Sequence, residues 1–119
     1  MKASEAISLV DRLRPNQYDS SIKIQWLLKL DGQIFDEIIR PRTCGIEFLP
    51  SEDLERELLV PFPYGEDVYN NYLQAMIDRE NGETAKYNQS ITLFHAAYSR
   101  YRNWFNREKR PLRKGRFIF

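Results

Sequence analysis

Histidine and cysteine, the side chains that most often act as catalytic bases or nucleophiles, each occur once in the chain. His95 has no carboxylate beside it in the sequence, although a general base needs a partner that orients it. Cys44 lies between a proline and a glycine, without a neighbouring histidine, and cannot form an intramolecular disulfide. We expect His95 to be a surface or boundary residue and Cys44 to be a free structural thiol of a protein in a reducing compartment.

Carboxylates are the other candidates for acid–base chemistry or metal binding. Adjacent positions on a helix point apart, and no histidine or cysteine completes a metal-ligand set. No glycine-rich loop suits a phosphate, and no serine stands in a nucleophile-elbow pattern. The sequence therefore predicts a protein that is not an enzyme and has no catalytic residues, no cofactor and no metal. The carboxylates expected on solvated faces are Asp36, Glu37, Asp78, Glu80 and Glu83.

The net charge of +1 is distributed unevenly along the chain. From Arg100 onward there are eight Lys and Arg residues and one acidic residue, whereas the first 99 residues hold ten basic and sixteen acidic ones. This asymmetry indicates an acidic body with a basic end. Basic residues mixed with aromatic ones could contact DNA phosphates without sequence preference, but no helix pair has the pattern of a helix-turn-helix reader. A merely solubilising tail is another interpretation of the basic end.

The periodicity of apolar residues predicts an all-α protein with a small four-helix domain. The first three expected helices cover about 4–14, 19–40 and 67–81, and the fourth begins within a few residues of Gly82 and reaches about Arg107. Ser4 and Asp19 are the expected N-caps, and Asn81-Gly82 is a left-handed stop. The last two helices should form an antiparallel hairpin. We assign residues 1–107 to the helical domain and 108–119 to a flexible basic and apolar C-terminal arm. No signal peptide or membrane-spanning run is expected.

Two of the predicted helices have distinctive apolar patterns. The second is apolar on more than one face, which indicates that it is central to the fold or covered by a partner. Its Gly32 is either a bend or close contact, or simply a tolerated glycine. The fourth has an aromatic stripe at helical spacing, which we expect to be core. The stripe consists of Tyr87, Ile91, Phe94, Tyr98, Tyr101 and Phe105.

A long proline-rich connection, residues 41–66, separates the second and third helices. Loops of this length are usually functional or packed as an irregular clasp. The apolar run Leu58-Leu59-Val60 is expected to lie across the helices, or else to form a short strand with residues 46–49. An acidic run precedes it, at Glu52, Asp53, Glu55 and Glu57.

Several blocks of the sequence together resemble the head–tail connector, or adaptor, proteins of tailed phages and prophages of Gram-positive bacteria. The likeness spans residues 4 to 107 and is carried by the order and spacing of the blocks. The blocks are Tyr18, Ile24-Gln25-Trp26-Leu27, Leu30-Asp31-Gly32-Gln33-Ile34, Leu58-Leu59-Val60-Pro61-Phe62-Pro63-Tyr64, Val68-Tyr69, Tyr72-Leu73, Met76-Ile77-Asp78, Asn81-Gly82-Glu83, Lys86-Tyr87-Asn88 and Phe94 to Tyr98.

The resemblance implies a structural virion protein that assembles as a homo-oligomeric ring beneath the portal protein at the capsid vertex. Such a ring extends the DNA channel and offers a platform to a head-completion (stopper) or tail protein. It would be made in the host cytoplasm, would be compatible with a free monomer, and would let packaged DNA pass without sequence-specific binding or membrane contact. The alternative is a small helical prophage protein that binds DNA non-specifically or is regulatory. By the resemblance, the portal-binding residues are Arg110, Arg113, Lys114, Arg116, Phe117, Ile118 and Phe119.

Overall fold

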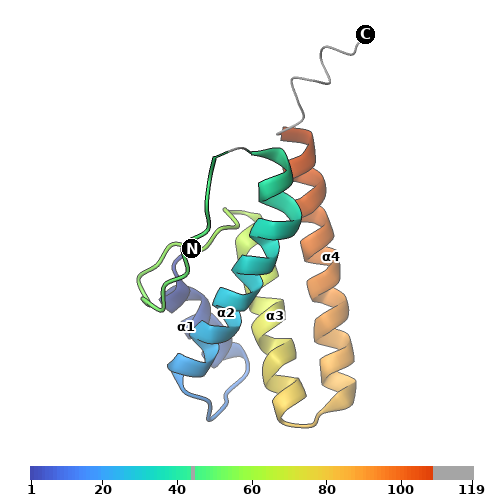
Figure 1. Cartoon of the computed structure of the whole chain (residues 1–119). Helices are drawn as coiled ribbons and strands as arrows, with labels where there is room; N and C mark the ends of the chain where they lie inside the picture. Colours follow the sequence, from blue (N-terminus) through green and yellow to red (C-terminus); the bar gives the residue numbers. More distant parts are fainter. Residues whose placement is uncertain (44, 109–119) are drawn as a thin grey trace.

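Four α-helices, with a long connection between the second and third, make up the part of the chain that the computed structural model describes, residues 1–43 and 45–108 (Figure 1). These residues contain no β-strand, only an isolated antiparallel bridge between Lys2 and Glu57. The predicted all-α, four-helix fold is confirmed. The elements are α1 (Ala3–Leu13), α2 (Ser20–Ile34), the π-helical turn η1 (Phe35–Ile39), the 3₁₀ turn η2 (Arg40–Arg42), α3 (Tyr64–Glu80) and α4 (Thr84–Glu108).

The start of α1 shows how the connection takes the place of a capping side chain. Ser4 was expected to cap this helix, but α1 begins one residue earlier, after Lys2. The first-turn amides of Ala3 and Ser4 donate to the carbonyls of Arg56 and Leu54, over 2.9 and 2.8 Å. Because the amides that a capping side chain would satisfy already have partners in the connection, the helix needs no serine at its N-cap.

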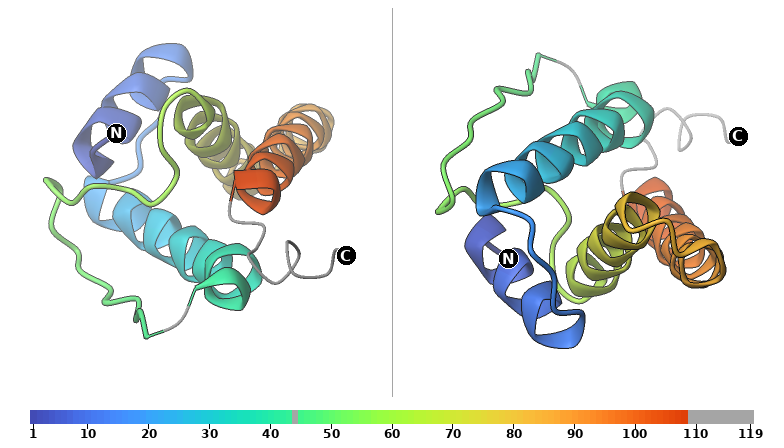
Figure 2. Two further views of the ribbon diagram at one scale, coloured as in Figure 1. Left: turned by 90° about the horizontal axis from the view of Figure 1, so that it is seen from above. Right: turned by 90° about the horizontal axis from the view of Figure 1, so that it is seen from below.

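The apolar residues of α2 are covered within the chain itself. Leu27, Leu30 and Ile34 are completely buried, and α2 contacts both α1 and α3. Figure 2 shows α3 between α4 and the pair formed by α1 and α2. The alternative of a central helix therefore accounts for most of its apolar residues, although Ile22 remains 41% exposed.

The last two helices form the predicted antiparallel hairpin (Figure 1). They turn at Asn81 and Gly82, and the φ of Gly82 is 74°, the left-handed conformation that glycine adopts readily. The stripe of α4 is core as predicted: its last four members are buried and its first two, Tyr87 and Ile91, are half-buried. α4 contacts η1, so its C-terminal end lies beside the end of the extended α2 (Figure 1).

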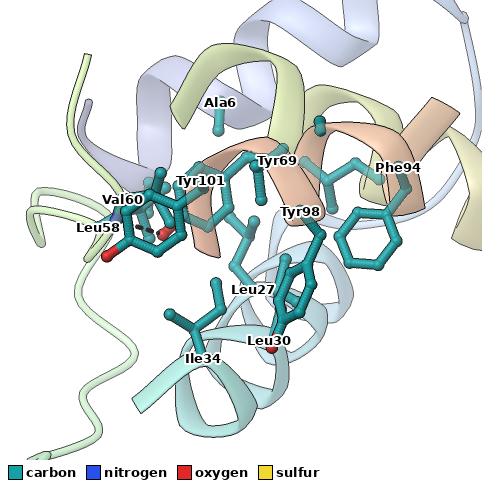
Figure 3. Packing of buried hydrophobic residues seen from close by; sticks show 14 of the residues in the cluster. Ala6, Leu27, Leu30, Ile34, Leu58, Val60, Tyr69, Phe94, Tyr98 and Tyr101 are labelled. Atoms are coloured by element: carbon teal, nitrogen blue, oxygen red, sulfur yellow. Dashed lines mark hydrogen bonds between the residues drawn. The ribbon is translucent and has the colours of Figure 1, made fainter. Parts of the chain in front are cut away.

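The connection returns across the helices and contributes to the core. Leu58 and Val60 are buried, and Figure 3 shows them beside Tyr69 and Tyr101. Leu58 N–H donates to the carbonyl of Met1 over 2.9 Å. The expectation that this run lies across the helices is confirmed. The alternative of a strand with residues 46–49 is wrong for the described residues, since Leu58 pairs with the N-terminus instead.

Alanine substitution is expected to change the stability of the fold in opposite directions at two glycines. A Cβ on Gly65, at the start of α3, would lie 2.5 Å from the carbonyl oxygen of Val60, whereas one on Gly32 would meet only the Phe48 ring at 3.7 Å. We predict that Gly65→Ala destabilises the fold by about 1–3 kcal/mol because backbone atoms must move. Gly32→Ala should stabilise it by about 0.5–1 kcal/mol through helix propensity. Urea denaturation of both variants measures this, and equal effects would contradict the packing described.

Candidate functional site

The residues predicted to bind a portal, Arg110 to Phe119, lie outside the described residues, so the structure reports only what precedes them. α4 ends at Glu108. Near this end the Nε of Arg42 in η2 donates to the Oδ1 of Asn106 over 3.2 Å. The side chains of Arg42 and Arg107 are exposed. The basic segment therefore continues from a helix end that is tied to η2 and already carries positive charge.

A group of aromatic side chains holds this end of α4 to the start of α3. The ring of Tyr64 lies 5.4 Å from that of Trp104 and 6.2 Å from that of Tyr101, between centroids. Phe105 packs on Tyr101 at 5.9 Å. Earlier in α4, the hydroxyl of Tyr98 donates to Glu37 of η1. Trp104 was not part of the predicted stripe, because it stands one position before Phe105 and so off the helical spacing; in the structure it is half-buried.

A buried carboxylate joins α2, α3 and the connection. Asp31 and Tyr69 are both completely buried. The Tyr69 hydroxyl donates to Asp31 Oδ1 over 2.5 Å, and Leu59 N–H donates to Oδ2 over 3.2 Å. The same tyrosine oxygen accepts from Val60 N–H over 2.9 Å, the contact dashed in Figure 3. Two consecutive amides of the connection are thus satisfied by side chains of α2 and α3.

Burial dominates the titration of this group. It raises the pKa of Asp31 from 3.8 to about 6, against hydrogen bonds from Tyr69 and Leu59 and the charge of Arg56, which lower it. Burial, and then the Asp31 charge, raise the pKa of Tyr69 well above its usual value. Burial and Asp31 likewise raise the pKa of Tyr101 to about 12. The arrangement binds the connection to α2 and α3.

A second buried carboxylate joins α1, α3 and α4. Asp78 was expected on a solvated face but is completely buried. Arg14, at the end of α1, donates through Nη1 to both of its carboxylate oxygens, and Ser90 Oγ donates to Oδ2 over 3.1 Å. The Nη2 of Arg14 donates to Gln74 Oε1 over 2.8 Å. The prediction for Asp78 is wrong because a partner 64 residues away compensates for its burial.

The other sequence-predicted residues are exposed or partly exposed. His95 is a surface residue, as expected, and Asp36, Glu37 and Glu80 are exposed, while Glu83 is half-buried and pairs with Lys86 at 3.0 Å. Cys44 lies outside the described residues. Within residues 1–43 and 45–108, no three acidic, histidine or cysteine side chains gather where they could hold a metal ion.

Comparisons of the chain with family models, with curated proteins and with solved structures found no match. Over the same described residues, none of the helices is both long enough and apolar enough to span a bilayer.

The two buried carboxylates were not identifiable as such from the sequence. Asp31 stands in an apolar helix beside Leu30 and Ile34, both completely buried, and this surrounding apolarity was the one available signal. Asp78 follows Met76 and Ile77 and offers a similar signal. Neither signal identifies the partner of the carboxylate, because Tyr69 and Arg14 are far from Asp31 and Asp78 along the chain.

We predict that Arg14→Ala destabilises the fold by about 3 kcal/mol, because it leaves the Asp78 carboxylate buried without its cation. The matched control is Arg12→Ala, which removes an exposed arginine from the same helix end and should cost no more than about 0.5 kcal/mol. Chemical denaturation at pH 7 measures both. Similar losses of stability in the two variants would show that Arg14 contributes only to the overall charge of the domain and not through its contact with Asp78.

Asp31 should give the fold a pH dependence that Asp31→Asn removes. Because the pKa is raised in the folded state, the folded protein binds more protons than the unfolded one between about pH 4 and pH 6. The stability contributed by Asp31 is therefore full below pH 4 and is lost as the pH rises through 6. Relative to Asp31→Asn, the wild type should lose about 3 kcal/mol between pH 4 and 7. Urea denaturation of both proteins at several pH values measures this. A difference in unfolding free energy between them that does not change with pH would contradict the prediction.

Proposed function

We propose that this chain is a head–tail connector of a tailed phage or prophage, a structural protein that docks on the portal ring. In this role its helical domain lines and extends the DNA channel and presents a platform to a head-completion or tail protein. The proposal starts from the ordered sequence blocks described above and gains support from how those blocks are arranged in the structure.

The observation that carries the proposal is that blocks far apart in the sequence meet in space. Asp31, Leu59 and Tyr69 belong to three different blocks and share one buried hydrogen-bond cluster. Tyr18, which packs on Trp26 with 6.0 Å between centroids, donates from its hydroxyl to Asn81 Oδ1 over 2.6 Å, joining three further blocks. The spacing that produces the resemblance thus coincides with the contacts that organise this fold.

The geometry of α4 suits docking through the C-terminal segment. α4 has 25 residues and α3 has 17, and the end of α4 is braced by aromatic contacts and by Arg42. A segment that follows a braced helix end starts from a fixed point, which lowers the entropy lost on binding. Its five cations can meet an acidic partner surface, and Phe117, Ile118 and Phe119 can be buried there.

The charge of the domain suits a channel wall. Sixteen acidic and ten basic residues precede Arg100, and like charge repels the phosphates of passing DNA. A wall of this kind allows DNA to slide without being held. The same balance disfavours the alternative of a protein whose function is to bind DNA.

Deleting residues 110–119 should weaken binding to the cognate portal protein at least about a hundredfold, because several buried apolar anchors are lost. Surface plasmon resonance on immobilised portal rings measures this. We also expect weaker binding with a smaller salt dependence when three cations of the segment, Arg113, Lys114 and Arg116, are changed together to Ser.

The matched control changes three exposed cations of the helices, Arg12, Lys29 and Arg79, to Ser and should leave portal affinity within about twofold. Portal binding that survives the deletion would rule out the assignment of the segment. No binding by the intact chain, together with duplex DNA binding that falls steeply with salt, would favour the DNA-binding alternative.

A further inference from the structure

A small hollow lies between the start of α2 and the connection. Its volume is about 200 Å³, below the range of about 300–1,000 Å³ that is usual for small-molecule sites. It is therefore of a size for one apolar side chain of a peptide rather than for a metabolite. It is lined by Ser20, Ser21, Ile24, Glu52 and Leu54.

The hollow combines an apolar lining with a carboxylate. Ile24 is buried and Leu54 is 39% exposed, so an incoming ring or aliphatic chain would contact both. Glu52 is an exposed residue and is held against α2 by the side-chain amide of Gln25, which donates to Oε2. A carboxylate beside an apolar hollow favours a cation next to an apolar side chain.

The connection that borders the hollow has a similar character along its length. Ile46 and Leu49 are 54% and 75% exposed. They precede the hollow along the connection, since the neighbouring Phe48 packs on Phe35, beyond the C-terminal end of α2, with 6.0 Å between centroids. Between Gly45 and Glu57 there are five acidic residues and one basic residue, Arg56. Lys2 and the N-terminal ammonium pair with two of the five, Glu55 at 3.2 Å and Glu57 at 2.7 Å. Glu47, Glu52 and Asp53 leave this surface acidic.

One stretch of this chain has the complementary chemistry. Residues 109–119 contain five cations, no acidic residue, and an apolar tip of two phenylalanines and an isoleucine. We propose that the hollow and the acidic, apolar surface of the connection bind residues 109–119 of a second copy of this chain. A tip side chain fills the hollow, and the cations meet Glu52, Asp53 and Glu47.

The distance along the molecule favours a second copy over the chain's own segment. Arg42 contacts Asn106 near the end of α4, and the hollow lies at Ser20–Ile24, at the opposite end of α2 (Figure 1). About eighteen helical residues separate Ile24 from Arg42, roughly 27 Å at 1.5 Å per residue. Eleven residues span at most about 36–40 Å when fully extended. The chain's own tip would have to cover at least about 27 of these 36–40 Å and so would reach the hollow only in a largely extended form, a constraint that a second copy does not have.

This inference goes beyond the proposed function and does not depend on it. It gives the basic segment a site on a second copy that is available without a portal. If both sites exist, they compete for the same residues, so that docking on the portal releases the contact between copies.

The test is the self-association of the full-length chain, measured by sedimentation over a range of concentrations. We expect reversible association that weakens as salt rises from about 0.05 to 0.5 M. Glu52→Lys combined with Leu54→Ser should weaken it at least about tenfold, since it removes an apolar contact and reverses a charge. Glu66→Lys, which reverses an exposed charge of α3, should leave it within about twofold.

A labelled synthetic peptide of residues 109–119 provides a second measurement that does not depend on oligomer formation. It should bind the intact chain in fluorescence anisotropy, and should bind the Glu52→Lys, Leu54→Ser variant at least about tenfold more weakly. The same peptide with Phe117, Ile118 and Phe119 replaced by Ser should not bind. Absence of peptide binding, equal binding by both peptides, or association insensitive to the double variant would overturn the proposal. Portal binding is measured separately, so either proposal can fail alone.

Discussion

The packing of the connection depends on the buried carboxylate of Asp31. Its oxygens accept from Tyr69 and from the amide of Leu59, while Tyr69 accepts from the amide of Val60. Without these acceptors two consecutive backbone amides would be left among apolar side chains without partners, at a cost of about 1–3 kcal/mol each. Burying the Asp31 carboxylate costs free energy, and the same desolvation raises its pKa. In return, the two amides of the connection gain a buried acceptor.

The dependence extends from the connection to α1. Once Leu59 and Val60 are held, the preceding residues lie against the N-terminus, and the carbonyls of Leu54 and Arg56 accept from the first turn of α1. The other end of α1 is fixed by Arg14 on Asp78. α1 is thus held at both ends by polar contacts with distant segments. At this end Leu13 is 56% exposed, whereas the side chain of Arg14 turns inward to Asp78 and is 27% exposed.

The sequence predicted those features that depend on local periodicity. Helical spacing located the four helices to within a few residues, and glycine preference located the turn at Gly82. The predicted stripe of α4 is core for the same reason, since its spacing matches the period of the helix. What could not be predicted depends on partners far apart in the chain. Asp78 resembles any solvent-facing carboxylate until Arg14 is brought to it, and Ser4 resembles a cap until the carbonyls of the connection replace it.

The way in which the connection is held also determines how its surface can be used. Arg56 lies over the ring of Phe48 at 4.8 Å and donates to the carbonyl of Leu49 over 2.8 Å. Exposed apolar side chains therefore stand on a backbone that is already fixed, and a partner need not pay to order it. The proposed contact joins the tip of one copy to the opposite end of another. Such a contact uses two different surfaces, so it closes into a ring if the rotation between copies allows and otherwise continues as a filament.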